Sequence, residues 1–114
     1  GAHWNMATWI QMRALDMCRV STAKGGYTGA IKVAHLAESF GMRAQVHGYD
    51  PSLCAAIPNN DYAEILVINT EQIKGLKNDP HHPVVGGYVT TSDEPGLGPQ
   101  PDWAELEKRA VLIV

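Results

Sequence analysis

The segment 29–41, GAIKVAHLAESFG, constrains the fold of this 114-residue chain more than any other. Its apolar side chains recur every three positions, at Ile31, Ala34, Ala37 and Phe40. This spacing predicts a helix that buries one face. Gly41 stands where a glycine commonly ends a helix, because glycine tolerates the left-handed conformation that follows the last turn.

An extended run on each side of this helix completes a strand–helix–strand unit. The run 16–21 lies before a glycine turn at 24–29, in which Thr28 is a fair N-cap, and the run 43–47 follows the helix. A helical crossover joins parallel strands and is right-handed in nearly all proteins. The predicted fold class is therefore α/β.

The alternation of helix and strand continues beyond residue 50. Segment 51–58 is predicted to be a short helix that starts at Pro51 or Ser52 and is closed by Pro58. The almost wholly apolar run 64–69 is typical of a buried parallel strand. Residues 1–15 are compatible with a further helix, and residues 70–76 with a short one. All three strands are expected to lie parallel in one sheet.

The last third of the chain has a different character. Valines and a tyrosine surround Gly86-Gly87, which favours a hairpin or a bent extended arm. Asp102 and Glu105 have capping-box spacing, so a terminal helix is expected after them. Tyr88, Leu97 and Trp103 are predicted to be the apolar anchors that fasten this arm.

Composition excludes several classes of protein. Hydrophobic residues make up 45% of the chain and the net charge is −3, with no basic stripe interleaved with aromatics, so a nucleic-acid partner is not supported. No apolar run approaches the roughly 18 residues of a membrane span. Cys18 and Cys54 lack CxxC spacing and are expected to be buried thiols rather than a disulfide. A cytoplasmic location is the default expectation.

His47 is the first candidate for chemistry, because function in parallel β/α folds collects at the carboxyl ends of strands. An imidazole exchanges protons near neutral pH, and Gly48 leaves room for a ligand. The alternative is a polar strand-end residue without chemistry. Glu64 begins an apolar strand, where a partly buried carboxylate needs a partner. The alternative for Glu64 is a pairing with a local amide.

Lys24 lies in KGGYTG, which has the composition of a phosphate cradle but lacks the G-x-G-x-x-G spacing. A plain tight turn is the alternative, and Lys24 then either reaches an anion or is solvated. Lys24 and Tyr49 are the candidate substrate-binding residues. The pair His81-His82 is interpreted as loop surface and His35 as exposed or half-buried.

Three segments together resemble one family. The segment 25–48, GGYTGAIKVAHLAESFGMRAQVHG, looks like the GGxTG–helix–strand–His segment of the enolase superfamily, in its mandelate racemase-like branch. AAIPNNDYAEILVI, 55–68, resembles the helix–strand segment that follows, and GGYVTTSDEPGLGPQPDW, 86–103, resembles the closing arm. The resemblance covers nearly the whole chain from about Asp16.

The resemblance implies a (β/α)8 barrel with a lid domain, in which Mg²⁺ is held by carboxylates at the ends of the middle strands. Such enzymes remove the proton α to a carboxylate and yield racemisation, cycloisomerisation or dehydration of sugar acids. By resemblance His47 matches the strand-seven general base or acid. Glu64 matches the strand-eight glutamate that hydrogen-bonds the substrate carboxylate or enediolate. The substrate class is a sugar acid or another carboxylate.

Two departures qualify the resemblance. Val20 occupies the position, about five residues before the glycine pair, where the family often has the aspartate that orients its histidine. A full barrel needs about 250 residues. The chain, 1–114, is therefore expected to be the carboxyl-terminal part of a barrel, inactive alone, without the lid, the early strands or the Mg²⁺ ligands. Association with a second copy is left open. The alternative is a non-catalytic α/β remnant that serves as a structural or interaction module.

Overall fold

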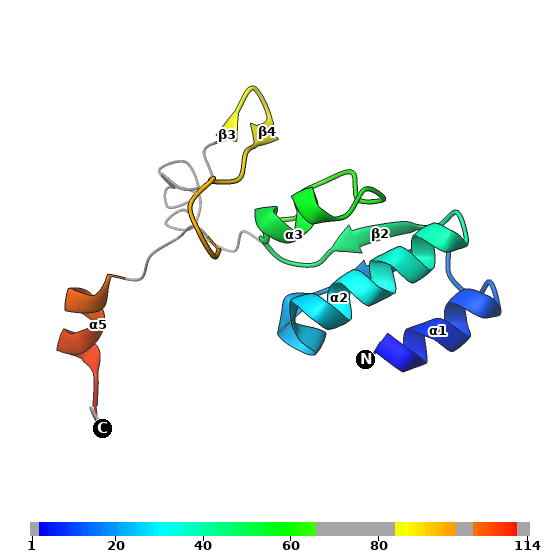
Figure 1. Cartoon of the computed structure of the whole chain (residues 1–114), viewed down its shortest axis with the longest axis horizontal. Coiled ribbons are helices and arrows are strands. Elements are labelled where there is room, and N and C mark those ends of the chain that lie inside the picture. Colours follow the sequence, from blue (N-terminus) through cyan, green and yellow to red (C-terminus); the bar gives the residue numbers. More distant parts are fainter. Residues whose placement is uncertain (1–2, 66–83, 98–101, 112–114) are drawn as a thin grey trace.

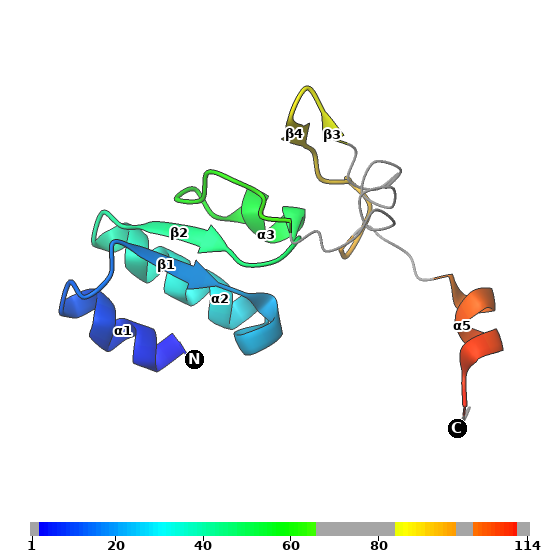
Figure 2. The ribbon, with the colours of Figure 1, turned by 180° about the vertical axis from the view of Figure 1, so that it is seen from behind.

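The structure, a computed structural model, describes residues 3–65, 84–97 and 102–111, which form an α/β body and a carboxyl-terminal arm (Figures 1 and 2). The elements of the body are α1 (His3–Gln11), β1 (Met17–Val20), α2 (Thr22–Ser39), β2 (Arg43–Val46) and α3 (Pro51–Ala56). Those of the arm are β3 (Val84–Val85), β4 (Tyr88–Val89) and α5 (Trp103–Arg109).

Strands β1 and β2 pair in parallel, with Met17 opposite Arg43 and Val20 opposite Val46. The predicted strand–helix–strand unit is therefore confirmed. Residues 63–65 follow without regular structure, and 66–69 lie outside the described residues, so the third predicted strand stays a prediction. Within the described ranges the parallel sheet has two strands and there is no closed barrel.

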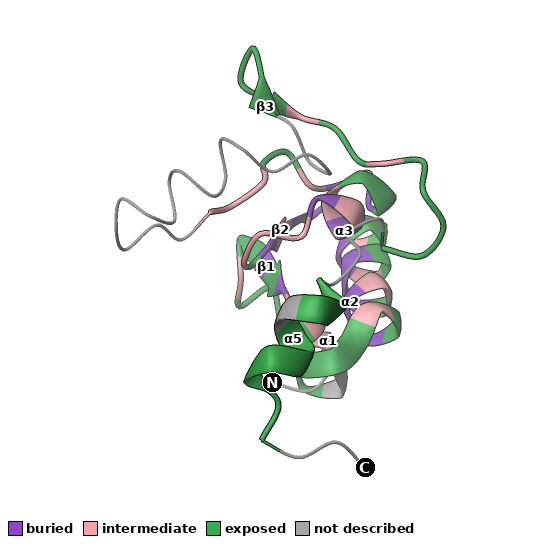
Figure 3. Cartoon of the chain, turned by 90° about the vertical axis from the view of Figure 1, so that its left-hand side faces the viewer, coloured by how far each residue is buried: buried purple, intermediate pink, exposed green. Residues whose placement is uncertain are grey.

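Helix α2 covers one face of the strand pair, and none of the described helices covers the opposite face, which we call the bare face (Figures 1 and 2). Residues alternate between the two faces of a strand. The buried set packs against α2 and consists of Cys18, Val20, Ala44 and Val46 (Figure 3). Arg19 and Gln45 belong to the opposite set, so the bare face carries polar side chains.

Helix α2 starts earlier than the sequence pattern predicted. The Ser21 side chain accepts a hydrogen bond from the backbone N–H of Ala23 at 3.3 Å, which caps a first helical turn inside the predicted glycine turn. The helix is interrupted at Gly26, whose φ of 62° and ψ of 179° lie outside the helical region. The prediction of Thr28 as the N-cap was wrong, because Ser21 begins the helix and Gly26 supplies the kink. Gly41, with φ 68°, follows the helix as predicted.

Asp50 joins the start of α2 to α3. Its carboxylate accepts hydrogen bonds from the backbone N–H of Leu53 at 3.0 Å and from the hydroxyl groups of Thr22 and Tyr27, each at 3.1 Å. Pro51 occupies the first turn of α3, as predicted, where a missing N–H does no harm. Cys54 on the same helix is only half-buried, whereas Cys18 is fully buried, and neither is in a disulfide.

Asn59 fastens the end of α2 to the start of β2 from inside the body. Its side-chain amide donates to the backbone carbonyls of Ala34 at 2.9 Å and Met42 at 3.0 Å, and its own backbone carbonyl accepts from Ala44 N–H at 3.0 Å. The side chain is buried, and its Oδ1 atom accepts no hydrogen bond from the residues that the structure describes. The side-chain amide therefore ties α2 to the residue before β2 through its two donated hydrogen bonds.

Asn59→Ala is expected to lower the free energy of unfolding by about 1–3 kcal/mol, because it removes the partner of two carbonyls in a buried site. Urea unfolding followed by circular dichroism measures the change. Asn5→Ala is the control, since Asn5 is exposed on α1 and alanine favours a helix. Equal stability of the two variants would contradict the proposed role of the buried amide.

The arm consists of the predicted hairpin and the predicted terminal helix. Strands β3 and β4 pair antiparallel around Gly86 and Gly87, whose φ values of 58° and 83° explain why glycines stand there. The prediction that Tyr88, Leu97 and Trp103 anchor the arm was wrong: all three are exposed, Tyr88 by 79%. The described residues provide no second layer for these side chains to pack against.

Some of the remaining predictions can be compared with the structure, and others concern residues that the structure does not describe. His35 on α2 is exposed, as expected. The pair His81-His82 and the helix predicted at 70–76 lie outside the described residues. None of the described helices is long and apolar enough to cross a membrane.

Candidate functional site

The carboxyl ends of β1 and β2 bring Arg19 and His47 together. Val20 and Val46 are paired at the strand ends, and the backbone N–H of His47 donates to the Val20 carbonyl at 2.7 Å. His47 therefore stands one residue beyond the last pair, on the same bare face as Arg19. This placement agrees with the predicted position of His47 at the carboxyl end of its strand.

Glu64 joins these two side chains from the segment after α3. Nη2 of Arg19 lies 2.5 Å from Nδ1 of His47 and 2.5 Å from Oε1 of Glu64, and it also contacts Oε2. Nδ1 of His47 lies 3.0 Å from Oε1 of Glu64. The structure thus brings together the two residues that sequence reasoning proposed as catalytic. We call this group the Arg19–His47–Glu64 cluster.

Arg19 is the member that sequence reasoning missed. Val20 is buried against α2, so its side chain points away from His47. The neighbouring residue in the strand faces the other way and stands beside the histidine. The alternation of exposed and buried residues along 17–20 is the signal that could have found it.

A pocket of about 280 Å³ adjoins the cluster at the start of α2. It is lined by Met6, Arg19, Val20, Ser21, Lys24, Gly25, Gly29, Ala30, Val33 and His47. Two of its side chains, Arg19 and Lys24, are cationic, and such a lining suits an anionic ligand. Lys24, a candidate substrate-binding residue from the sequence, therefore lines this cationic pocket. Tyr49 is half-buried and does not line this pocket.

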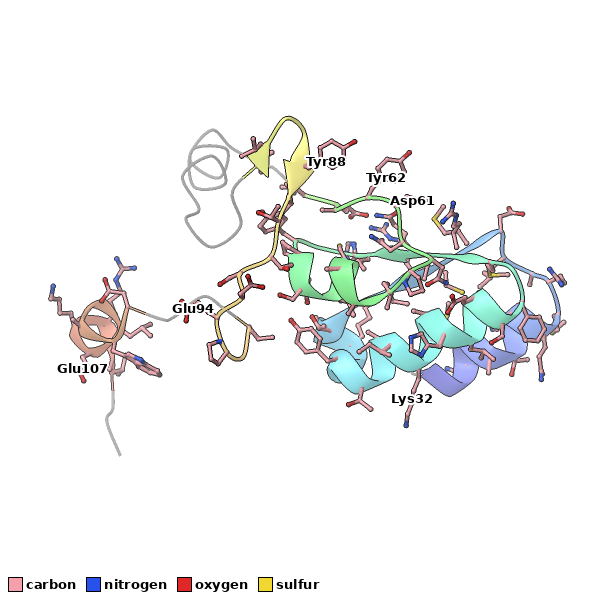
Figure 4. All side chains as sticks on the ribbon, turned by 45° about the horizontal axis from the view of Figure 1, so that its top comes forward. Lys32, Asp61, Tyr62, Tyr88, Glu94 and Glu107 are labelled. Carbon is pink, nitrogen blue, oxygen red and sulfur yellow. The ribbon has the colours of Figure 1, made fainter. Side chains whose placement is uncertain are left out.

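A second pocket, of about 740 Å³, lies between the segment after α3 and the β3–β4 hairpin. Tyr62 and Tyr88 both line it, and their rings project from the hairpin and the neighbouring segment in Figure 4. Both rings are largely exposed. This pocket is apart from the cluster, since none of the three cluster residues lines it.

The pKa of the Glu64 carboxyl lies below its ordinary value. The hydrogen bond with His47 is the largest cause. Desolvation has the second-largest effect and acts in the opposite direction, and the charge and hydrogen bond of Arg19 add smaller lowering effects. Each of these favourable contacts favours the ionised form. Glu64 is therefore an anion near neutral pH.

This lowered pKa predicts how stability depends on pH. The folded state gains stability from Glu64 above the unfolded-state pKa of about 4.3 and loses it as the pH falls through the lower folded-state pKa. Glu64→Gln is expected to remove this part of the acid sensitivity. Urea midpoints near neutral pH and below about pH 4 measure it in both proteins. An equal loss of stability on acidification in both would contradict the prediction.

The cluster is not a metal site as it stands. Across 3–65, 84–97 and 102–111, no group of three or more His, Cys, Asp and Glu side chains could hold a metal ion. The one carboxylate of the cluster is occupied by a guanidinium.

The sequence model of the family described as enolase C-terminal domain-like matches residues 2–105. Among solved structures, D-glucarate dehydratase from Agrobacterium tumefaciens, complexed with magnesium, shares 32% identity at a TM-score of 0.82, over 95% of this chain and 30% of that one. A mandelate racemase/muconate lactonizing enzyme from a marine actinobacterium, in complex with magnesium, shares 21% identity at a TM-score of 0.76, over 94% of this chain and 31% of that one. The second likeness shows the fold alone.

The chain spans less than a third of the length of either of these solved enzymes. Among curated proteins, none matches the sequence.

Proposed function

The chain belongs to the enolase C-terminal domain-like family, and we propose that it forms the carboxyl-terminal β/α units of a (β/α)8 barrel in a sugar-acid dehydratase. The whole enzyme would remove the proton α to a carboxylate with the help of Mg²⁺. The observation that carries this proposal is the meeting of His47 and Glu64 beside a cationic pocket, at the carboxyl ends of parallel strands. Active sites of (β/α)8 barrels lie at that end.

Dehydration is favoured over the other outcomes by the likeness to D-glucarate dehydratase, at an identity that reaches beyond the fold. A sugar acid carries the carboxylate that Arg19 and Lys24 can pair with in the 280 Å³ pocket. Its neighbouring hydroxyl groups can donate hydrogen bonds to Ser21 and His47 or accept hydrogen bonds from them. The substrate class is therefore a hydroxylated carboxylic acid.

His47 and Glu64 have complementary parts in this proposal. His47 faces the pocket and would exchange a hydrogen bond or a proton with the bound acid. Glu64, ionised and paired with Arg19, would fix the position of the guanidinium. Mg²⁺, when bound, would stabilise the negative charge of the enediolate. The described residues do not fit that ion, so its ligands would belong to other parts of the enzyme.

The test uses the product of the complete reading frame, because the chain spans less than a third of its solved neighbours. The purified protein is incubated with Mg²⁺ and a panel of sugar acids that starts with D-glucarate. Dehydration releases one water and leaves a keto-deoxy acid, which is detected as its semicarbazone. Proton NMR in deuterated water reports exchange of the α proton without dehydration. Exchange or racemisation without a keto product would overturn the assignment as a dehydratase.

A non-catalytic module is the second candidate, and one observation favours it. The guanidinium of Arg19 stands beside Nδ1 of His47 together with Glu64, and a cation there opposes the protonation that a base must undergo. This candidate predicts that the complete protein exchanges no α proton in any acid of the panel. Exchange above the rate without protein would exclude it.

A further inference from the structure

A single nitrogen atom, Nη2 of Arg19, contacts both candidate acid–base groups. A guanidinium has donors only and keeps its protons in proteins. Its 2.5 Å contact with Nδ1 of His47 is therefore a hydrogen bond that Nδ1 accepts. In the neutral ring the same Nδ1 cannot then donate to Oε1 of Glu64, although the two atoms are 3.0 Å apart. The donation to Glu64 that lowers the pKa of that carboxyl belongs to the ring protonated on Nδ1.

We propose that Arg19 is a positioning residue that holds neutral His47 in the tautomer protonated on Nε2. His47 then offers a hydrogen-bond donor, not a base, to an oxygen of the ligand in the 280 Å³ pocket. The class of ligand, a hydroxylated carboxylate, rests on the proposed function, whereas the tautomer rests on the contact alone.

A guanidinium beside Nδ1 favours the opposite tautomer of the ring from the one that a carboxylate beside Nδ1 favours. A carboxylate next to Nδ1 holds the proton there and leaves Nε2 free to accept one. A guanidinium occupies the lone pair of Nδ1 and leaves the proton on Nε2. The two hydrogens of Nη2 suffice for this arrangement, one shared with Nδ1 of His47 and the other with the carboxylate of Glu64.

The tautomer bears on which reaction the site supports. A racemase needs a group that accepts a proton on each face of the α carbon, and a ring protonated on Nε2 does not serve as one of them. A dehydratase needs a base on one face and a donor toward the departing hydroxyl or the enediolate oxygen. Arg19 therefore suits His47 to donate a hydrogen bond to an enediolate oxygen without giving up its proton, and the proton that turns the departing hydroxyl into water would come from a general acid elsewhere in the complete enzyme.

A neighbouring ion pair, between Arg43 and Asp61, provides a comparison for Arg19. Arg43 on β2 pairs with Asp61 at 2.9 Å, and its side chain is exposed by 57%, against 56% for Arg19. No histidine contact accompanies that pair among the described residues. Exposed pairs of this kind contribute little stability. Arg43 is thus a matched control for Arg19.

The test is nitrogen NMR of the isotope-labelled chain at about pH 9, where imidazole rings are neutral. The resonances of His47 are identified by their loss in His47→Gln, and exposed His35 serves as an internal reference. The expected spectrum shows His47 protonated on Nε2. Arg19→Met is expected to shift the ring to the Nδ1-protonated form, which donates to Glu64, and Arg43→Met is expected to leave it unchanged.

Arg19→Lys is expected to restore the Nε2-protonated form in part, because an ammonium group also donates. A native chain with His47 protonated on Nδ1 would overturn the proposal, and so would an unchanged tautomer in Arg19→Met. If Arg19→Met unfolds, the native spectrum and Arg19→Lys still decide. Loss of the proposed enzymatic function would leave this spectrum unaffected, so the two failures are distinguishable.

Discussion

Replacing His47 with asparagine is expected to lower kcat of the complete enzyme about a hundredfold, at the lower end of the roughly 10²–10³ that one hydrogen-bond donor toward developing negative charge contributes. The amide of asparagine reaches about as far as Nδ1 and cannot place a donor where Nε2 stands. The lower end is expected because the ring, with Arg19 beside it, donates a hydrogen bond and transfers no proton. Steady-state kinetics on the accepted sugar acid measure the change, with magnesium binding and the fold unaltered.

His47→Gln and His35→Asn sharpen this prediction. Glutamine carries its amide nitrogen to about the position of Nε2, so it is expected to retain more turnover than asparagine if the ring acts as a donor. Equal losses in both variants would indicate a proton acceptor instead. His35 is exposed on α2, and its replacement is expected to change nothing. Turnover of His47→Asn within a few-fold of the parent would leave His47 a strand-end residue without chemistry.

Leu53→Ala is expected to have the largest effect on stability, a loss of about 2–5 kcal/mol in the free energy of unfolding. Leu53 is 0% exposed and belongs to the single buried cluster that joins α3 to the strands and α2. Its removal leaves a cavity that the six-residue helix α3 has little means to fill. Urea unfolding followed by circular dichroism measures the loss.

Leu106→Ala is the matched control for this substitution. Leu106 lies on α5 and is 49% exposed, so the same change of side chain removes little buried area. A change within about 0.5 kcal/mol is expected for a surface position. Comparable losses in the two variants would mean that the arm is packed against a surface beyond the described residues.

Sequence periodicity predicted the body well because local rules decide it. The helix after the glycine pair, the two strands and the short helix after Asp50 follow from spacing, proline and glycine alone. The predicted start of α2 was wrong. Both Ser21 and Thr28 are residues that can cap a helix, and which of them does so depends on Gly26 adopting a positive φ. That conformation depends on tertiary context, which periodicity does not contain.

The candidate site was predicted in part. His47 and Glu64 were found because a titratable residue at the end of a predicted strand, or at the start of an apolar one, is easily recognised in the sequence. Arg19 was missed because its place opposite His47 depends on the register between β1 and β2, which no local pattern fixes. The exposed Tyr88 and Trp103 were taken for anchors because hydrophobicity predicts burial only where a partner surface exists.

The two free thiols, Cys18 and Cys54, differ in burial and can therefore be used to measure local opening of the body. Cys18 is fully buried on β1, with its Sγ 3.6 Å from Sδ of Met42, and burial raises the pKa of its thiol. An alkylating reagent can reach it only when β1 separates from α2, whereas half-buried Cys54 is accessible with less opening. The ratio of the two labelling rates therefore reports, without denaturant, the free energy of opening the strand that carries Arg19.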